Sequence, residues 1–490
     1  MKCEKGVSFE DCELAILRSA IDKTEEMQGK KLMRDENMQK IIELVENFIR
    51  DKKLICYGGT AINNILPKDA QFYNLEVEIP DYDFFSSNAL DDAKALADIY
   101  NKEGFEEVEA KSGVHKGTYK VFVNFIPVAD ITQLNKELFS SISKEAIKVN
   151  GIRYCPPNYL RMAMYLELSR PLGDVSRWEK VLKRLTLLNK YYPLKVNNCN
   201  VSEIQRIFVD DNKMTENTET VIFKTVLDSL TDQNVVFFGA FANKLYLRTL
   251  KEYKNNLKKV PDFDVLSDNP ETTAKIVKER LEDVDIKHVK IIKRGGIGEI
   301  IAPHYEVVVS GDTICFIYEP LACHSYNLIH YKNRKVRIAT IDTTLSFYLA
   351  FVYANRPYYD KNRLLCMSNY LFFVQQKNRL TQKGILKRFS ISCYGKQDTI
   401  ETMRAEKTEM FKKLKNKKSS KEYEEWFLRY IPSENKTKKV ENKKDETKKD
   451  ESKKDETKHN KTIKKHWKKK NEAKKNKKTK KGLLSRFFNL

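Results

Sequence analysis

Apolar residues in the first part of the chain recur at steps of three and four positions, the spacing of one face of an α-helix. This pattern predicts helices over residues 9–22 and 36–48. An apolar run over residues 54–57 predicts a short strand, and a second helical pattern over 61–66 ends at Pro67. The order is therefore helix, strand, tight turn and helix.

The downstream sequence contains both the helical spacing of apolar residues and the alternation typical of strands. A charged helix is predicted from about residue 90 to 100, and strands near 106–111 and over 119–130. A long helical region follows over 158–191, interrupted at Pro171. Strands and helices in this mixture predict an α+β fold.

An internal repeat organises these elements. The segment that begins at Gly58 resembles the one that begins at Gly239, and the Asp-x-Asp motif at Asp81 resembles the one at Asp262. In both copies the glycine precedes the aspartate by 23 positions. Two such units at equal internal spacing predict two tandem copies of one module, joined by a helical connector.

Composition excludes several classes of protein. The chain has 490 residues, of which 41% are hydrophobic, enough for more than one domain. The longest apolar run, Val235–Ala242, is far shorter than the roughly 20 residues of a membrane span, so no span is expected. The 9 cysteines are scattered without a Cys-x-x-Cys pair, from which we expect reduced thiols in a cytosol-like compartment.

Charge is distributed unevenly along the chain. The formal net charge is +22, and Lys-rich tracts follow residue 442. Low hydrophobicity with high charge predicts a disordered C-terminal tail. A basic protein of this kind favours anionic partners such as nucleic acid.

The first copy contains a candidate phosphate cradle. Gly58, Gly59 and Thr60 lie between a predicted strand and a predicted helix. Glycines let the backbone approach a ligand closely, and a helix N-terminus offers free N–H groups to an anion. An ordinary Gly-Gly turn is the alternative interpretation.

Three carboxylates follow the cradle. Asp81 and Asp83 lie on one face of an extended strand, and Asp130 ends the alternating run over 119–130. On neighbouring strands, these three side chains would hold two divalent ions, Mg²⁺ or Mn²⁺. The alternative is a surface loop after Pro80 and an aspartate that merely terminates a strand.

The combination of Gly-Gly-Thr, Asp-x-Asp and a distant strand aspartate resembles the polymerase-β-like nucleotidyltransferase superfamily. More narrowly, residues 57–66, 80–86, 113–132 and 393–397 resemble the poly(A) polymerase catalytic subunits of large nucleocytoplasmic DNA viruses. The resemblance covers roughly residues 40–415.

This resemblance implies template-independent addition of AMP from ATP to RNA 3′ ends, as in the synthesis of mRNA poly(A) tails. It implies that Asp81 and Asp83 bind both metal ions and the ATP phosphates. It implies that Asp130 binds the metal ion nearest the 3′-hydroxyl, and that the phosphates are held by Gly58, Gly59 and Thr60.

The second copy departs from the first at these positions. The pair Ala240–Phe241 replaces Gly59–Thr60, and Phe241 would crowd a phosphate. An alignment of the chain with itself matches Asp130 with Cys323, which removes the third carboxylate. We therefore expect the second copy to be catalytically inactive. In the alternative, another acid completes its site, either Asp312 or Glu319.

The repeat and the resemblance together predict five parts. These are a catalytic nucleotidyltransferase domain with N-terminal helices (1–145), a helical connector (146–200), a second, degenerate nucleotidyltransferase-like domain (201–400), C-terminal helices (401–433) and a disordered basic tail (434–490).

Basic residues near the predicted site are candidates for RNA binding. We single out Lys116 and Lys120, which accompany aromatic residues, and Arg177 on the connector. A solvated helix face is the alternative for Arg177.

Other aspects of function stay open in the sequence. A homodimer is one alternative for the assembly. The resemblance implies a place in the host cytoplasm, at the viral factory, with packaging in the virion as a further option. Two other functions also stay open: a nucleotidyltransferase with a different nucleotide or acceptor, and a non-catalytic RNA-binding protein on a vestigial transferase fold.

Overall fold

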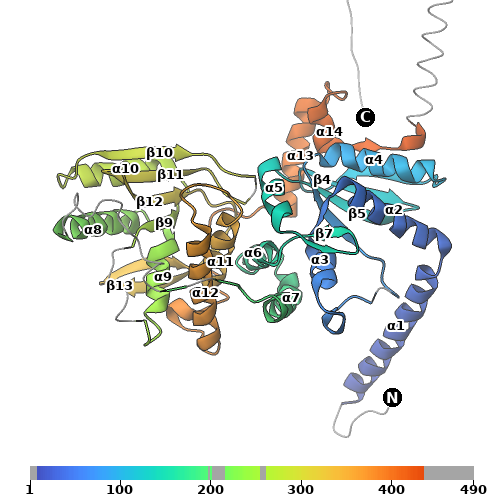
Figure 1. The fold of residues 1–490 in the computed structure, drawn as a ribbon, viewed down its shortest axis with the longest axis horizontal. Helices are drawn as coiled ribbons and strands as arrows, with labels where there is room; N and C mark the ends of the chain where they lie inside the picture. The colour runs from blue at the N-terminus through green and yellow to red at the C-terminus, as the bar shows by residue number, and fades with distance from the viewer. Residues whose placement is uncertain are drawn as a thin grey trace, which may run out of the picture. The chain divides into compact units, whose positions relative to one another are not determined.

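The computed structural model describes residues 8–74, 76–196, 199–200, 216–253, 261–298 and 300–434 (Figure 1). The Lys-rich tail lies outside these ranges from residue 435 onward. Met1–Ile431 form one compact unit.

The first module is built on an eight-stranded sheet with the order β16-β3-β4-β5-β2-β1-β7-β6. Its strands are β1 (Ile55–Cys56), β2 (Tyr82–Ser86), β3 (Val108–Ser112), β4 (Thr118–Val123), β5 (Ile126–Gln133), β6 (Ile147–Val149), β7 (Ile152–Tyr154) and β16 (Arg429–Tyr430). Its helices are α1 (Phe9–Met33), α2 (Glu36–Lys52), α3 (Gly58–Ile65), η1 (Lys68–Ala70), α4 (Ala89–Lys102) and α5 (Lys136–Glu145).

The predicted early helices are present, with different environments. The side chain of Asp35 caps α2 by accepting a hydrogen bond from the Met38 N–H, and an apolar stripe on α2 is buried. None of the residues of α1 is buried. The stripe of α2 consists of Met38, Ile41, Val45, Phe48 and Ile49.

The predicted single strand over 119–130 is wrong, because β4 and β5 form an antiparallel hairpin there. The chain turns at Asn124 and Phe125, whose φ angles are 50° and 65°. Positive φ at both central positions is the geometry of a type I′ turn. The sequence lacks the Asn-Gly or Asp-Gly pair that usually signals this turn, so the alternation appeared to continue through it.

The second module repeats the first. Its sheet has the order β10-β11-β12-β9-β8-β14-β13-β15. Its strands are β8 (Val236–Phe238), β9 (Phe263–Leu266), β10 (Val289–Arg294), β11 (His304–Val309), β12 (Asp312–Tyr318), β13 (His324–Tyr331), β14 (Arg334–Ala339) and β15 (Cys393–Tyr394). Its helices are α8 (Glu216–Asp232), α9 (Gly239–Leu247), α10 (Pro270–Glu282), α11 (Ile341–Phe351), α12 (Lys361–Lys377) and η3 (Gly384–Leu386).

Seven strands correspond one to one between the two sheets, with β3-β4-β5-β2-β1-β7-β6 matching β10-β11-β12-β9-β8-β14-β13. The sheets differ in the eighth strand, since β16 joins one edge of the first and β15 the opposite edge of the second. The predicted α+β fold with two tandem modules is therefore confirmed.

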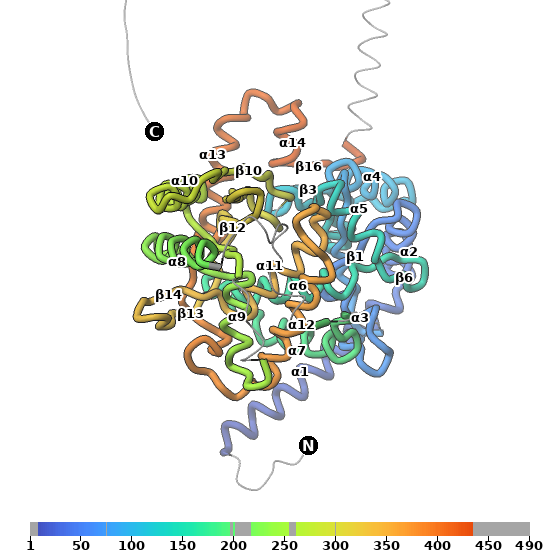
Figure 2. The backbone as a smooth tube through the Cα atoms, turned by 60° about the vertical axis from the view of Figure 1, so that its left-hand side comes forward, coloured from blue at the N-terminus to red at the C-terminus, as the bar shows by residue number. Residues whose placement is uncertain are grey.

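Helices connect the modules. The connector contains α6 (Pro157–Leu168), η2 (Val175–Arg177) and α7 (Trp178–Tyr191), and α6 packs against α11 of the second module (Figures 1 and 2). The range predicted as connector also includes β6 and β7, which extend the first sheet. After the second module, α13 (Ile400–Leu414) and α14 (Lys421–Phe427) return the chain to β3 through β16.

The cysteines differ from the expectation of reduced thiols. Disulfides join Cys199 to Cys366 and Cys323 to Cys393. The partners are 167 and 70 positions apart in sequence, so only the fold brings them together. Among the described residues, no helix has the length and apolar character to cross a bilayer.

Candidate active site

The acids predicted to act together lie on neighbouring strands. Strands β2 and β5 are parallel, and their register pairs Asp83 with Asp130. Paired residues on adjacent strands point to the same face of the sheet, about 5 Å apart. Asp81 precedes β2 by one residue, two positions from Asp83.

The cradle lies against these acids. Gly58 has a φ of 73°, and a Cβ atom at this position would lie 2.5 Å from the Asp83 carboxylate. Only glycine satisfies both constraints. The Tyr57 N–H donates to the Asp83 carbonyl at 2.9 Å, and no side chain of the described residues caps the N-terminus of α3. The first N–H groups of α3 therefore begin directly beside the carboxylates.

Thr60 is the last residue of the predicted cradle. Its side chain is buried, and its hydroxyl donates to the backbone carbonyl of Asp81 at 2.7 Å. This hydrogen bond fixes the start of the Asp-x-Asp segment against α3. The side chain of Thr60 therefore joins the predicted cradle to the acids.

The carboxylates repel one another. Burial raises the pKa of Asp83 to about 7, with further upward contributions from Asp81 and Asp130. Burial and Asp130 also raise the pKa of Asp81, while Lys120 and Lys180 lower it. Clustered carboxylates with raised pKa values favour the binding of a cation.

Lys120 supplies one cation from the chain itself. Its ammonium group on β4 donates to the Asp130 carboxylate on the adjacent β5. As the side chains lie, no three metal-ligating groups of the described residues gather around one point. The donor set, three carboxylates on neighbouring strand positions, nevertheless fits hard divalent ions, which prefer oxygen ligands.

The three residues predicted to bind RNA have partners within the chain. Lys116 lies over the Trp426 ring at 5.0 Å, Lys120 pairs with Asp130, and Arg177 lies 3.4 Å from the Glu167 carboxylate. Arg177 also lowers the pKa of Asp83, which brings it into the electrostatic environment of the acids.

At the strand position that corresponds to Asp130, the second module has Phe316 and not the Cys323 that the self-alignment gave. Strand β9 pairs in parallel with β12, and the register places Phe316 beside Asp264. Phe316, and not Cys323, therefore corresponds to Asp130, so the self-alignment was out of register. Neither Asp312, opposite Val309, nor Glu319, beyond the end of β12, occupies this position.

The cradle of the second module is filled from within. A Cβ atom on Gly239 would lie 1.8 Å from the Asp264 carboxylate, which accepts a hydrogen bond from the Ala240 N–H. Phe241 is buried and packs against Phe237 at 5.2 Å between ring centroids. The expectation that Phe241 crowds a phosphate is therefore wrong, because its ring points into the core.

Sequence reasoning missed Arg363. This residue of α12 lies 3.6 Å from the Asp262 carboxylate, and both acids of the second module raise its pKa. Arg363 lies about 100 residues after the motif, so no local sequence pattern links it to Asp262 and Asp264. Arg363 thus places a positively charged side chain beside Asp262 and Asp264.

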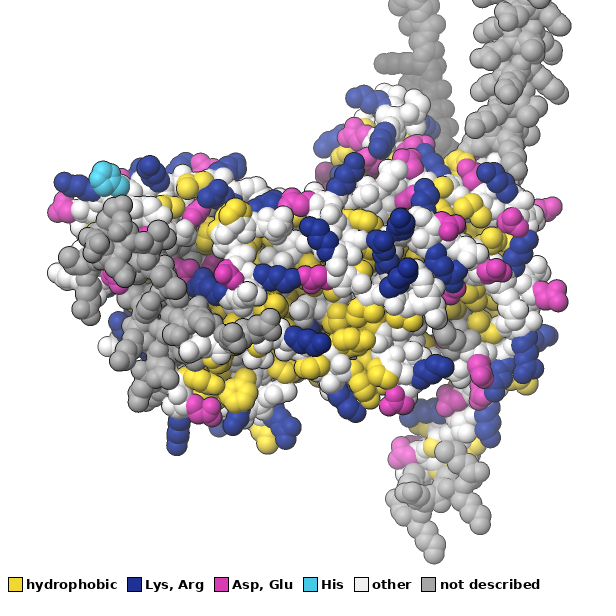
Figure 3. All heavy atoms as spheres, in the orientation of Figure 1, with side chains coloured by type: hydrophobic (Ala, Val, Ile, Leu, Met, Phe, Trp, Pro, Cys, Tyr) yellow, Lys and Arg dark blue, Asp and Glu magenta, His cyan; other side chains and the backbone are white. Residues whose placement is uncertain are grey.

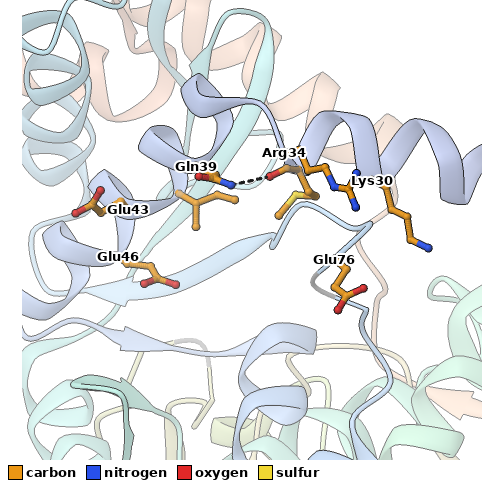
Figure 4. Close-up of a pocket in the computed structure, with 8 residues that line it drawn as sticks. Lys30, Arg34, Gln39, Glu43, Glu46 and Glu76 are labelled. Carbon is orange, nitrogen blue, oxygen red and sulfur yellow. Dashed lines mark hydrogen bonds between the residues drawn. The ribbon is translucent and has the colours of Figure 1, made fainter.

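Pockets elsewhere in the first module lie apart from the acid cluster. One lies between α1 and α2 and is lined by side chains of both signs, including Lys30, Arg34 and Glu43 (Figure 4). A larger cavity of about 890 Å³ is lined by Tyr82, whose side chain is on the opposite face of β2 from Asp83. Neither pocket includes a residue of the predicted site.

Paired aspartates on two parallel strands therefore lie beside a glycine cradle in the first of two similar sheets. Residues 43–174 match the protein family described as the poly(A) polymerase catalytic subunit. This range contains the cradle and all three acids of the first module, so the resemblance stated from the sequence is confirmed there.

Relatives in two viruses support the same resemblance. A candidate poly(A) polymerase catalytic subunit of Acanthamoeba polyphaga mimivirus is 32% identical over 194 residues, covering 36% of this chain and 32% of the relative. One from African swine fever virus (strain Badajoz 1971 Vero-adapted) is 35% identical over 161 residues, covering 32% of this chain and 34% of the relative. The alignments thus span about a third of these relatives.

A solved structure extends the comparison to the fold of both modules. The crystal structure of the Megavirus polyadenylate synthase matches with a TM-score of 0.72 and 20% sequence identity, over 92% of this chain and 91% of that one. At this identity the match establishes the fold.

Proposed function

We propose that this chain is a polynucleotide adenylyltransferase that adds AMP from ATP to RNA 3′ ends without a template. The observation that carries the proposal is the register of Asp83 with Asp130 beside the Gly58 cradle. The family match over residues 43–174 supports the same activity.

Different residues of the first module would bind the phosphates and the metal ions. The N–H groups at the start of α3, beside Gly58 and Gly59, would receive phosphates. Asp81, Asp83 and Asp130 would hold two divalent ions, which supply charge neutralisation at the reacting oxygens when bound. The 3′-oxygen forms a bond to the α-phosphorus while the bond to the bridging oxygen breaks, and pyrophosphate leaves with that electron pair.

Incubation of the full chain with labelled RNA, Mg²⁺ or Mn²⁺, and each nucleoside triphosphate separately tests this proposal. We expect extension with ATP. Preference for UTP or CTP would support a different nucleotidyltransferase. The absence of extension with every triphosphate would support an RNA-binding protein on a vestigial fold. The Asp83→Ala variant is the control for contaminating polymerases.

RNA binding would rest mainly on charge. Lys and Arg side chains are scattered among Asp and Glu on the face shown in Figure 3. Neutralised phosphates release counterions, so the logarithm of affinity should fall linearly with that of salt concentration. Lys116, Lys120 and Arg177 remain our candidates, with Arg177 the first to test because 56% of its side chain is exposed.

We also infer a role in the synthesis of mRNA tails in the host cytoplasm, at the viral factory or in the virion, from the viral relatives. Fractionation of infected cells and analysis of purified particles test this. Light scattering with and without RNA tests the homodimer.

A further inference from the structure

Three cations form a row at the start of α7 and along it: Arg177 directly precedes the helix, and Lys180 and Arg184 lie on it. Arg177, Lys180 and Arg184 are spaced by three and four positions, which places them on one helix face. Arg184, the last of the three, reaches Gly59 at the start of α3. Lys183 instead is 73% exposed and pairs with Glu179 on the same helix.

Arg184 extends this row to the glycine cradle. A Cβ atom on Gly59 would lie 2.9 Å from Nη1 of Arg184 and 2.4 Å from the hydroxyl of Tyr73. The glycine therefore allows both groups to approach the start of α3. Thr60, the next residue, is the one that holds Asp81, so Arg184 and the acids flank the same turn of helix.

Two aromatic residues hold the guanidinium of Arg184 in place. Nη2 donates to the Tyr73 hydroxyl at 2.6 Å, and the group lies 4.9 Å from the ring centroid of Phe72. The N–H groups of Phe72 and Tyr73 both donate to Oδ1 of Asn63, on α3 itself, at 2.8 and 2.9 Å. The cradle helix thus carries the clamp that orients Arg184.

Within the described residues, no carboxylate forms an ion pair with Arg184. A cation in this position, beside the positive end of a helix, favours an anion between the two. The planar guanidinium suits a phosphate because it can donate two parallel hydrogen bonds.

We propose that Arg184 binds the β- and γ-phosphates of the incoming nucleoside triphosphate, and that Tyr73 positions its guanidinium. This inference rests on the proposed function, which requires the α-phosphorus near Asp83 and Asp130. The cradle then directs the remaining phosphates toward Gly59, where Arg184 lies.

Titration calorimetry of the full chain with inorganic tripolyphosphate tests this inference without catalysis. EDTA in the buffer removes the contribution of divalent ions. We expect Arg184→Met to raise the Kd at least tenfold, about 1.4 kcal/mol. Arg184→Lys keeps the charge but lacks the planar guanidinium, so its Kd should lie between those of the parent and Arg184→Met. Tyr73→Phe should have a smaller effect than Arg184→Met, and Lys183→Met, the matched control, none.

AMP provides the second arm, since it lacks the β- and γ-phosphates. We expect Arg184→Met to leave AMP affinity within twofold of the parent. An equal loss for AMP and tripolyphosphate would overturn the assignment to the distal phosphates. So would a parent chain that does not bind tripolyphosphate, or an Arg184→Met variant that binds it as tightly as Lys183→Met.

Melting curves accompany each titration. If Arg184→Met fails to fold, the test relies on Arg184→Lys and Tyr73→Phe. Parental affinity for tripolyphosphate in both of these variants would overturn the inference. Failure of the two proposals is distinguishable. Tripolyphosphate binding through Arg184 without RNA extension would refute only the adenylyltransferase. Extension of RNA with unchanged tripolyphosphate binding in the variants would refute only the role of Arg184.

Discussion

Arg363 lies 3.6 Å from Asp262 in the second module, at the motif that corresponds to Asp81 and Asp83 of the first. Burial and the neighbouring Asp262 raise the pKa of Asp264, and Arg363 lowers it. The second module therefore places a cation beside its Asp-x-Asp pair, whereas in the described part of the first module the printed ion pair is between Lys120 and the third acid, Asp130. The two modules share a sheet but differ in what compensates the carboxylates.

Replacement of Arg363 should destabilise the fold. We expect Arg363→Met to lower the free energy of unfolding near neutral pH by more than the roughly 1 kcal/mol of an exposed pair, because half-buried carboxylates lose a nearby cation. Burial raises the pKa of Asp264, so the protonated form is favoured in the folded state and stability falls as pH rises. The loss should therefore diminish as pH is lowered from 8 to 5.

Thermal melts across this pH range measure the effect. Lys377→Met is the matched control, because Lys377 on the same helix pairs with Glu252 at the surface. A loss for Arg363→Met that is no greater than that of the control, at every pH, would contradict a charge-compensating role.

The second module should contribute no chemistry. Changing only Asp262 and Asp264 would remove two carboxylates beside the Arg363 cation, and a loss of activity would then be ambiguous. We therefore predict that the triple variant Asp262→Asn, Asp264→Asn, Arg363→Met keeps turnover within a few-fold of the parent. Rates of RNA extension at saturating ATP measure this. A loss as deep as that of Asp83→Ala would show that the second module is catalytic.

The first-module acids should behave in the opposite way. We expect Asp83→Ala, Asp130→Ala and Asp81→Ala each to abolish RNA extension, because no other carboxylate on β2 or β5 can replace a lost ligand. Stability without metal should be unchanged or higher for Asp83→Ala, since the substitution removes a carboxylate whose pKa is raised by burial and by repulsion from Asp81 and Asp130. Extension assays and melting curves in EDTA measure the two effects. Near-parental extension with a normal melt would refute the metal-ligand assignment.

The sequence predicted the parts of the site that lie close together in the chain. Equal spacing from Gly58 to Asp81 and from Gly239 to Asp262 was sufficient to predict two modules, because a strand, turn and helix are local features. It could not locate Arg184 or Arg363, since each reaches its partner only through the packing of a helix more than 90 residues away.

Strand register was the second feature that could not be predicted from the sequence. The hairpin turn at Asn124–Phe125 interrupts the alternation without a glycine, so the two strands β4 and β5 read as one. The self-alignment matched prolines and placed Cys323 opposite Asp130, whereas backbone pairing places Phe316 there. Register depends on hydrogen bonds between strands that are distant in sequence, which residue identities alone do not define.

Acid should destabilise the fold through His324, at the start of β13. The side chain is 1% exposed, neither ring nitrogen has a hydrogen-bond partner among the described residues, and the ring lies 5.0 Å from that of Phe347. Burial, and then the charge of Arg170, lower the pKa of His324 to about 3. The folded chain therefore holds this imidazole neutral under conditions in which the unfolded chain protonates it.

This difference in protonation determines how stability depends on pH. Below pH 6.5 the unfolded state binds a proton that the folded state excludes, so the free energy of unfolding falls as pH falls toward 3. At pH 5 this corresponds to about 2 kcal/mol. We predict that His324→Phe reduces the difference in melting temperature between pH 7.5 and pH 5 relative to the parent. His330→Phe, at an exposed position on the same strand, should leave that difference unchanged. If both variants keep the parental pH dependence, His324 is not the group that couples protonation to unfolding.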